Sequence, residues 1–551
     1  MIKPSKYDDD GYVIRWLRSS VPSNSLACLY TLTEEVGSSH LLGEDVEIHI
    51  DVYDESNSRI PVRKIINMIK KNNGNGVVCL VGVQTNQFPR AMDLARIFRR
   101  EGIRTLIGGF HVSGCVAMLP ELPPELKGAM AEGITLVAGE IEGKWGNILK
   151  DAYSGKLAPL YNLLDEKPPL KGSPPPIMPK QLKSRYVGKL TTIDTGRGCP
   201  FECSFCTVIN VQGKKSRGRT ADEVEWAIRE NFKNGLRQYF ITDDNFSRHR
   251  DWEEILDRII HLREKEKIKI SFIIQVDTAC HRIPRFIEKA ARAGCTKVFI
   301  GLESINPNTL KGVGKKQNRI EEYREMLMAW RKVRVITCAG YIIGFPDDTY
   351  ESIMEDLELI KRELPLDLMG FSILTPLPGS EDHRRLYTEG VWLEPDLDRY
   401  DGEHAVIHHK RMSSEEWIRA WHSVWESFYS MEHVETIFRR AGASHLSLGK
   451  LTGQVLWFYG SIKYEGVHPL QAGILRMKDR RSRRPGLPLE NPLIFYPRQL
   501  WELIRCSYSI ARLAWRLHKI RKRVQESPDY RSYTDAAMEP ALSSQEAEGM
   551  S

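Results

Sequence analysis

From Leu190 onward the chain repeats one pattern six times, a short apolar stretch followed by an amphipathic helix. The apolar stretches are predicted strands at residues 190–196, 238–245, 270–278, 297–304, 333–346 and 368–380. Apolar runs of this length separated by helices are typical of parallel strands that are covered on both faces. The pattern therefore predicts an open, partial barrel, and the active-site groups of such a barrel lie at the carboxyl ends of its strands.

The first 150 residues alternate in the same way. Strands are predicted at residues 46–54, 76–84, 103–109 and 134–140, and helices at 23–36, 62–71 and 90–102. Continuous apolar strands separated by helices predict a parallel sheet with helices on both faces. The strand expected before the helix at 23–36 has only residues 1–4 available, so that strand is short or the start codon is placed late.

The rest of the chain lacks strand signals. Residues 151–189 contain the proline-rich stretch EKPPLKGSPPPIMPKQ and are predicted to be a linker. The barrel is expected to end near residue 390, and residues 391–530 show helical, tryptophan-rich patterning that includes a basic amphipathic helix at 500–523. The polar residues 531–551 are expected to be disordered. The predicted class is thus α/β, with two sheet-containing domains and a helical C-terminal region.

Composition indicates the cellular compartment of the protein and the distribution of its charge. The chain contains no run of eighteen apolar residues, so no membrane span is predicted. The N-terminus also lacks a secretory signal, and we therefore expect a cytoplasmic chain. Ten cysteines in 551 residues are too few for a disulfide scaffold. Between Arg476 and Arg523 there are fourteen lysines and arginines against three acidic residues, so the basic surplus belongs to the C-terminal region.

Three of the ten cysteines, Cys199, Cys203 and Cys206, follow the first barrel strand with the spacing C-x3-C-x2-C. Three thiolates can hold three irons of a [4Fe–4S] cluster and leave the fourth iron open. The alternatives are a zinc site completed by a remote histidine and three unrelated buried thiols. Zinc sites favour two C-x2-C pairs, whereas this segment has a single such pair, Cys203 and Cys206, so the spacing favours the cluster. Phe205 precedes the last cysteine and is placed to shield the cluster from solvent.

This loop at the start of a six-unit barrel resembles the radical S-adenosylmethionine (SAM) superfamily, over residues 190–380. The resemblance implies a (βα)6 partial TIM barrel and an open iron that chelates SAM, whose reductive cleavage gives a 5′-deoxyadenosyl radical. Residues at the strand ends where this superfamily has its SAM-binding motifs would bind SAM. They are Asp243, Asp244 and Asn245 after the second strand, Glu303 and Ser304 after the fourth, and Gly344 in GYIIGFP. An Asx turn and an ordinary buried strand are the alternatives for the first and last of these segments. Arg217 and Arg219 are candidates to neutralise the cluster.

The N-terminal sheet resembles the flavodoxin-like or Rossmann-like cobalamin-binding domain of the class B enzymes of this superfamily. Loops at the carboxyl ends of its strands would lie under the corrin ring, as ligands do in open α/β sheets. The candidate residues are Thr85, Asn86, Gly108, Gly109, His111, Gly139 and Glu140. The pattern D-x-H-x-x-G, which supplies a lower axial histidine, is absent, and this absence implies binding without a histidine ligand.

The resemblance implies a radical SAM enzyme that methylates an unactivated carbon of a small molecule or lipid. A cobalamin-independent cyclisation, rearrangement or oxidation is the first alternative, and a non-catalytic iron–sulfur protein is the second. A reducing partner such as flavodoxin or ferredoxin is expected. The basic C-terminal helix could contact the cytoplasmic face of a membrane or pack as a solvated helix; nucleic acid is an unfavoured partner. Cys280 and Cys338 are candidate hydrogen donors or radical relays, although small buried thiols are commoner in such strands.

Overall fold

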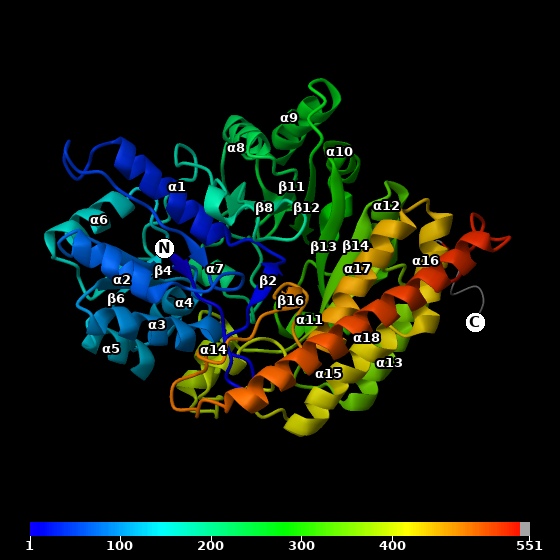
Figure 1. The fold of residues 1–551 in the computed structure, drawn as a ribbon. Helices are drawn as coiled ribbons and strands as arrows, with labels where there is room; N and C mark the ends of the chain where they lie inside the picture. Colours follow the sequence, from blue (N-terminus) through cyan, green and yellow to red (C-terminus); the bar gives the residue numbers. More distant parts are fainter. Residues whose placement is uncertain (540–551) are drawn as a thin grey trace. The chain divides into compact units, whose positions relative to one another are not determined.

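The structure is a computed structural model that describes residues 1–539 (Figure 1). The chain forms two compact units. Unit 1 comprises Met1–Arg258, Thr375–Asp401 and Leu470–Leu503. Unit 2 comprises Ile259–Leu374, Gly402–Pro469 and, within the described residues, 504–539. Each unit is described by itself below.

Unit 1 contains a parallel sheet of six strands in the order β3-β1-β4-β5-β6-β7. The strands are β1 (Ile2–Lys3), β3 (Tyr53–Asp54), β4 (Val77–Leu80), β5 (Arg104–Gly108), β6 (Thr135–Gly139) and β7 (Leu160–Leu163). The short first strand and the three strands β4 to β6 confirm the expected alternation. Two predictions need correction. The apolar alternation at 46–52 forms no ladder and only its end becomes β3, and the predicted linker contains β7, which pairs with β6.

Helices cover both faces of this sheet. Alternate strand residues face opposite sides because the side-chain period of a strand is two. Cys79, Leu106 and Val137 therefore pack with α1 (Asn24–Ser38) and α6 (Trp145–Ser154). Leu80, Ile107 and Leu136 pack on the other face. The helices on that face are α2 (Val62–Lys71), α3 (Phe88–Arg100), α4 (Phe110–Met118) and α5 (Pro124–Ala131).

Unit 1 also holds the first two barrel strands, β8 (Leu190–Ile193) and β11 (Gln238–Ile241), which pair in parallel. The helix between them, α8 (Ala221–Lys233), begins at a capping box of Thr220 and Glu223, as its sequence TADE predicts. The strands β9 (Gly196–Arg197) and β10 (Arg217–Gly218) pair antiparallel on either side of the cysteine segment. The shorter helices α7 (Val208–Val211) and α14 (Glu381–Thr388) belong to this unit as well.

Unit 2 holds the remaining four barrel strands. The strands β12 (Ser271–Val276), β13 (Cys295–Glu303), β14 (Ile336–Ile343) and β15 (Leu368–Ile373) pair in parallel and in chain order. They alternate with α10 (Phe286–Ala293), α11 (Pro307–Gly312), α12 (Tyr323–Lys332) and α13 (Tyr350–Glu363). The helix α9 (Trp252–Glu264) leads from the strands of unit 1 into this unit. All six predicted strand–helix units are thus present, and the fold is α/β with parallel sheets and a helical C-terminal region.

The C-terminal helices complete unit 2. They are α15 (Ser414–Phe428), α16 (Met431–Ala443), α17 (Leu448–Gly460) and the long α18 (Pro492–Glu526), which begins in unit 1. Helix α15 covers the last strand, β15. Trp421 Nε1 donates to Phe371 O at 2.9 Å, and Tyr429, just after α15, donates to Met369 O at 2.7 Å. These two carbonyls are two residues apart on β15, so the side chains satisfy backbone groups that an edge strand leaves unpaired.

Two features at the ends of the chain differ from expectation. Residues 391–530 contain a strand after all, β16 (Gly473–Arg476), which pairs antiparallel with β2 (Trp16–Ser19) in unit 1. In the predicted tail, Asp535 accepts a hydrogen bond from Arg440 Nε at 2.7 Å and Ala537 is buried, so packing extends beyond residue 530. Residues 540–551 of that tail lie outside the described part of the chain. Among the described residues, no helix is long and apolar enough to cross a membrane.

Candidate cluster and cofactor site

The cysteine segment leaves β9 through a tight turn at Gly198. Gly198 has φ +91°, and a Cβ at this position would lie 2.6 Å from Lys215 O, so only glycine fits. The loop is held by backbone bonds from Cys199 N to Gly213 O at 3.3 Å and from Cys206 N to Cys203 O at 3.1 Å. Cys203 is buried, whereas Cys199 and Cys206 are partly exposed. The three thiols are thus gathered on one short, braced loop, as the spacing predicts.

The three thiols are close enough for their charges to interact. Burial, with negative charge on Cys203, Asp244 and Cys199, raises the pKa of Cys206 to about 12, so this thiol keeps its proton unless a metal binds the sulfur. Three thiolates therefore repel one another unless a cation holds them together. The irons of a [4Fe–4S] cluster supply that charge, because each iron binds thiolate sulfur. The donor set and its placement fit this cluster.

The three acceptors after β11 have different surroundings. Both carboxylate oxygens of Asp243 accept hydrogen bonds from Thr195, from its backbone N at 2.7 Å and its hydroxyl at 2.5 Å. Asp244 Oδ2 accepts from Gly198 N at 3.3 Å, directly beside Cys199. Asn245 Oδ1 accepts from Ser247 Oγ at 2.7 Å. Burial raises the pKa of both Asp243 and Asp244 to about 7. The structure thus brings Asp244 to the cysteine loop and gives Asp243 a bracing contact with the strand end.

Arg197 connects the cysteine loop with the N-terminal sheet. Its guanidinium lies 2.8 Å from Glu140 Oε2, 2.7 Å from Glu142 Oε1 and 2.7 Å from Asp194 Oδ2. Glu140 and Glu142 follow β6, and Asp194 follows β8. Burial alone would raise the pKa of Asp194, but the charges of Arg219 and Arg197 outweigh burial and lower it. Four charged groups therefore form a paired network at the base of the cysteine loop.

The two arginines after the loop extend this network. Arg217 pairs with Glu140 and donates to Pro168 O at 2.6 Å. Arg219 is buried, with Asp194 Oδ1 at 3.2 Å and Ser173 O at 2.7 Å. Arg219 thus joins the end of β8 to the proline-rich segment, and Arg217 joins Glu140 after β6 to the same segment. Their observed partners are these protein groups.

A cavity of about 200 Å³ opens in unit 1 at the carboxyl ends of β4, β5 and β6. Apolar side chains of the sheet and of α1 line its floor, among them Leu29, Cys79, Leu106 and Val137. Polar groups at its rim include Ser25, Ser113, Glu142, Arg197 and Gln212. Four of the seven predicted cobalamin residues line it, namely Gly108, Gly109, Gly139 and Glu140. A concave, mostly apolar site with a few polar groups is typical of cofactor binding.

The other three predicted cobalamin residues, Thr85, Asn86 and His111, do not line this cavity. The prediction of a loop at residues 108–114, GGFHVSG, needs correction, because α4 begins at Phe110 within this segment. Phe110 and Ser113 consequently face the cavity, whereas His111 is buried on the opposite side with its Nδ1 3.3 Å from Thr85 Oγ1. A helix over this segment places Ser113 and not His111 on the side of the cavity. Recognising the helical period in the sequence would therefore have predicted Ser113 as the lining residue.

Polar cavity residues that sequence reasoning missed include two on α1 and two beside the cysteines. Asn24 and Ser25 belong to the first turn of α1, where SNS follows a proline and predicts a helix start. Arg197 and Gln212 flank the cysteines in the sequence and gave no separate signal. Their contribution follows from the tertiary contact between the cysteine loop and the end of β6.

Unit 2 carries the other predicted SAM residues. Glu303 has a left-handed φ of +65° at the end of β13 and pairs with Lys315. Ser304 is buried, and its Oγ accepts from Asn306 N at 2.9 Å. Gly344 has φ +95°, and a Cβ there would lie 2.1 Å from the Trp417 indole, whose Nε1 donates to Ile343 O at 2.9 Å. The close approach at Gly344 is thus to Trp417 of α15.

The two candidate relay cysteines are fully enclosed in unit 2. Cys280 and Cys338 are buried, and burial raises the pKa of Cys338 to about 12. Three histidines of residues 404–410, HAVIHHK, lie outside any helix, and His409 Nε2 lies 2.8 Å from Phe345 O. The two thiols are thus packed in the protein interior, and the His409 imidazole contacts a backbone carbonyl.

A repeat of strands and helices opened by a loop of three cysteines defines an iron–sulfur enzyme of the α/β class. Residues 193–360 match the Radical SAM superfamily, so this part of the chain is similar to the members of that superfamily. Its radical SAM domain implies a [4Fe–4S] cluster and SAM as cofactors.

Similar proteins extend this result. A bacteriochlorophyllide d C-8(2)-methyltransferase of Chlorobaculum tepidum is 29% identical over 358 residues, which cover 61% of this chain and 74% of that protein. Among solved structures, the radical SAM methyltransferase TsrM of Kitasatospora setae with cobalamin and a [4Fe–4S] cluster bound has a TM-score of 0.52 at 17% identity. That match covers 71% of this chain and 78% of TsrM. The cobalamin-dependent SAM radical enzyme OxsB with aqua-cobalamin and SAM bound has a TM-score of 0.52 at 14% identity, covering 94% of this chain and 80% of OxsB. The two structures show a shared fold.

Proposed function

We propose that this chain is a cobalamin-dependent radical SAM methyltransferase that methylates an unactivated carbon. The observation that carries the proposal is that one side chain, Arg197, belongs to both halves of the site. Arg197 lies two residues before Cys199, lines the cavity of the N-terminal sheet and pairs with Glu140 at that cavity's rim. The cavity and the cysteine loop lie in the same compact unit. A cofactor in this cavity would therefore be next to the cluster loop.

The chemistry of the residues present supports both cofactors. When bound, the cluster with SAM supplies a 5′-deoxyadenosyl radical and cobalamin supplies a transferable methyl group. Cys199, Cys203 and Cys206 would hold the cluster, and Asp244 fixes their loop through Gly198 N. The cavity floor would exclude water from the corrinoid, while Ser113, Glu140 and Gln212 offer polar contacts at the rim. The reaction also needs an electron, which a reducing protein such as flavodoxin or ferredoxin would supply.

The named relatives support methyl transfer as the reaction. The relative from Chlorobaculum tepidum and TsrM both carry the word methyltransferase, and they act at different substrates by name. The proposal for this chain therefore stops at a small-molecule or lipid acceptor. Cyclisation, rearrangement or oxidation without cobalamin remains the second candidate, and it predicts an empty cavity in the working enzyme.

The test follows the methyl group. The protein is purified anaerobically, its cluster is reconstituted, hydroxocobalamin is added, and the sample is incubated with a strong reductant and SAM labelled in its methyl group. Label recovered in the protein-bound corrinoid is the expected result, and no label should stay with the protein when hydroxocobalamin is left out. Reductive cleavage of SAM with no corrinoid retained by the protein would overturn the methyltransferase proposal in favour of the second candidate. Neither cleavage nor corrinoid binding would leave a non-catalytic iron–sulfur protein.

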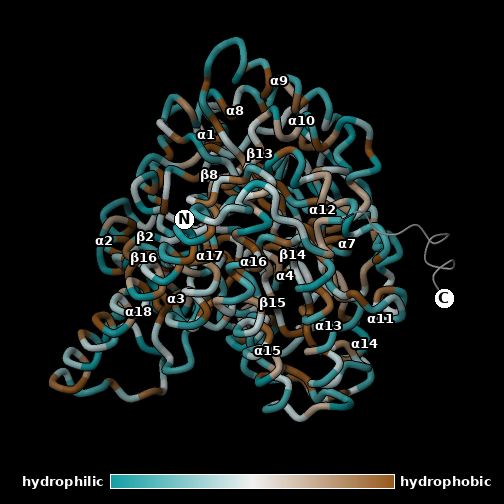
Figure 2. Tube along the Cα trace, turned by 90° about the vertical axis from the view of Figure 1, so that its right-hand side faces the viewer, coloured by the Kyte–Doolittle hydropathy of each residue, from teal (hydrophilic) through white to brown (hydrophobic). Residues whose placement is uncertain are grey.

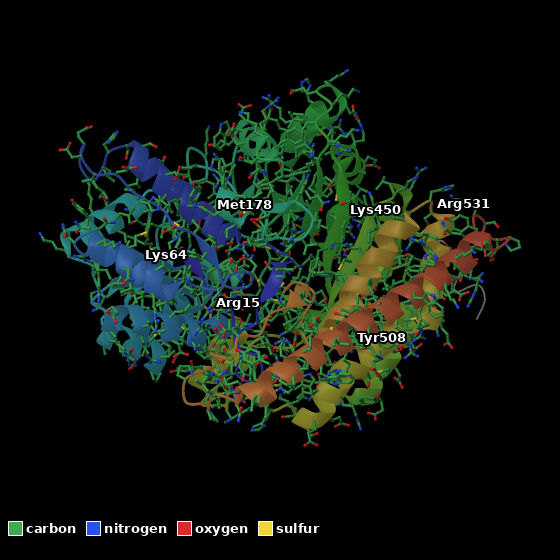
Figure 3. All side chains as sticks on the ribbon, in the orientation of Figure 1. Arg15, Lys64, Met178, Lys450, Tyr508 and Arg531 are labelled. Carbon is green, nitrogen blue, oxygen red and sulfur yellow. The ribbon has the colours of Figure 1, made fainter. Side chains whose placement is uncertain are left out.

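We also propose that α18 attaches the protein to an anionic membrane surface. Leu493, Leu500, Ile504, Tyr508 and Trp515 are between 53% and 83% exposed and recur at helical spacing. Arg505, Arg512, Arg516 and Lys519 are exposed beside them. Figure 2 shows hydrophobic and hydrophilic segments alternating along α18, and Tyr508 is marked on this helix in Figure 3. A helix with an apolar stripe and basic flanks is suited to the boundary of an anionic bilayer.

Vesicle sedimentation tests this attachment. The protein should pellet with phosphatidylserine-containing vesicles and less with pure phosphatidylcholine vesicles. Trp501→Glu, at a position that is 64% exposed on α18, should abolish pelleting, whereas Trp226→Glu, at a 48% exposed position on α8, should leave it unchanged. Equal pelleting of both variants, or none by the unmodified protein, would contradict the attachment.

A further inference from the structure

Three side chains of unit 1 that the proposed function does not use converge on one point. They are His111 and Cys115 of α4 and Glu125 in the first turn of α5. His111 and Cys115 are four residues apart and share one face of α4, turned away from the cavity that Ser113 lines. One donor atom of each of the three side chains lies within 4.8 Å of the others. His111 Nε2 lies 3.7 Å from Glu125 Oε1.

The imidazole of His111 is buried with one nitrogen unused. Its side chain is fully enclosed, and within residues 1–539 Nε2 has no hydrogen-bond partner. Leaving a buried polar atom unpaired costs about 1–3 kcal/mol, so such an atom calls for an explanation. The other ring nitrogen, Nδ1, lies 3.3 Å from Thr85 Oγ1, and the ring contacts Phe88 with centroids 4.4 Å apart. The ring is held at Nδ1, and its Nε2 faces Glu125. Metal-binding histidines are commonly held in this way, with one nitrogen on the metal and the other on a supporting group.

The surroundings leave this nitrogen able to bind a cation. Burial, together with the neighbouring His383, lowers the pKa of His111 to about 3, and Nε2 of this neutral ring has no hydrogen-bond partner among the described residues. His383, at the start of α14, is itself buried and neutral, because burial lowers its pKa to about 4. Its Nδ1 also lacks a partner among the described residues. Neither histidine therefore opposes a cation by its own charge.

The spacing of the donors matches a small tetrahedral ion. Zinc bonds of about 2.0–2.3 Å place neighbouring ligand atoms roughly 3.3–3.7 Å apart. The observed 3.7 Å between His111 Nε2 and Glu125 Oε1 is about 0.3 Å longer than the roughly 3.4 Å expected for a nitrogen and an oxygen ligand, and Cys115 Sγ lies within 4.8 Å of both atoms. One imidazole, one thiolate and one carboxylate are ligands that zinc accepts together. A shift of about 1 Å at the cysteine would close the site.

We propose that His111, Cys115 and Glu125 bind a zinc-type divalent cation, separate from the iron–sulfur cluster. The thiol of Cys115 loses its proton to solvent as its sulfur bonds the metal, while His111 donates its existing lone pair and Glu125 its carboxylate. The Glu125 side chain is 33% exposed, so the fourth position is open to water there. The ion joins α4 to α5 behind the sheet and stabilises unit 1; it does not depend on the proposed methyl transfer.

Metal content tests the site on the full chain. The protein is prepared without chelators or affinity metal, both unmodified and with Cys199, Cys203 and Cys206 replaced by alanine, so that the cluster cannot mask a second ion. We expect about one equivalent of zinc in both proteins, and its loss in His111→Ala and Cys115→Ser. Cys79→Ser, which removes a buried thiol of β4 in the same unit, is the matched control and should keep the ion.

Two further measurements cover the case in which a buried variant fails to fold. Glu125→Gln keeps the shape of a partly exposed side chain and should still lose at least about tenfold in zinc affinity. Added Zn²⁺ should raise the unfolding temperature of the unmodified protein, since an ion that binds only the folded state stabilises it. Co²⁺ added to the zinc-free protein should give a thiolate-to-cobalt charge-transfer band that Cys115→Ser abolishes. No stoichiometric metal and no such band in the unmodified protein would overturn the proposal, as would unchanged zinc affinity in Glu125→Gln.

Discussion

Arg197 Nη1 lies 2.8 Å from Glu140 Oε2, so an ion pair joins the loop of the cluster cysteines to the end of β6. Each partner comes from a separate sequence motif, GRGC and AGEIEG, about sixty residues apart in the chain. The pair is largely enclosed, with side-chain exposures of 12% and 7%. A buried, hydrogen-bonded ion pair with further partners on both sides fixes the distance between the two motifs. Their joint arrangement therefore depends on Arg197.

Replacing Arg197 by methionine should destabilise unit 1. The change leaves Glu140, Glu142 and Asp194 without a shared partner in a buried place, and breaking such a pair costs about 3–5 kcal/mol. The midpoint of urea denaturation of the apoprotein measures this loss. Arg237→Met removes an exposed guanidinium near the start of β11 and should leave the midpoint almost unchanged. Equal midpoints for the two variants would show that the network contributes nothing.

Gly344→Ala should displace the first turn of α15. An added Cβ would lie 2.1 Å from the Trp417 ring at φ +95°, and overpacking of this kind costs at least about 1–3 kcal/mol. Gly453→Ala in α17 meets no atom within 4 Å and should be neutral or stabilising by up to about 1 kcal/mol. Thermal unfolding compares the two. The account of Gly344 fails if its alanine variant unfolds at the temperature of the unmodified protein.

His433 should make unit 2 sensitive to acid. Burial, with Arg440 and Lys361 nearby, lowers its pKa to about 3, whereas the unfolded chain protonates histidine near pH 6.5. The unfolded state binds the extra proton between these values, so stability is full above about pH 6.5 and falls as the pH drops toward 3. At pH 5 the loss is about 2 kcal/mol.

Urea denaturation at pH 7 and pH 5 measures this effect. His433→Gln removes the titrating group and should lose less stability on acidification than the unmodified protein. His261→Gln, at a 60% exposed side chain, should behave like the unmodified protein. An identical pH response in the His433 variant would show that the buried imidazole is not the source.

Much of this fold follows from local patterns. Each predicted barrel strand is present because apolar runs between amphipathic helices have few other ways to bury themselves. Helix starts also follow from local residues, as at Thr220, which caps the first turn of α8. The strands β2 and β16 escaped prediction because their pairing joins residues more than 450 positions apart, and neither segment alternates in hydropathy.

The site was predictable in part. Three clustered thiols and glycines at strand ends are local signals, and the structure places them on one loop and at one cavity. Arg197 has no local signal, because an arginine gains its importance only from the carboxylates that the fold brings to it. His111 was misplaced because one residue of shift along a helix turns a side chain by about 100°. Trp417 could not have been paired with Gly344, since no sequence pattern links them.

The central claim is that this chain holds a cluster and a corrinoid together. Iron, sulfide and cobalt are counted after anaerobic purification, cluster reconstitution, addition of hydroxocobalamin and removal of the unbound excess, and the absorbance spectrum is recorded. The account predicts about four irons and one cobalt per chain, with iron lost and cobalt retained when Cys199, Cys203 and Cys206 are replaced by alanine. About four irons with no cobalt would contradict it and leave a radical SAM enzyme that works without cobalamin.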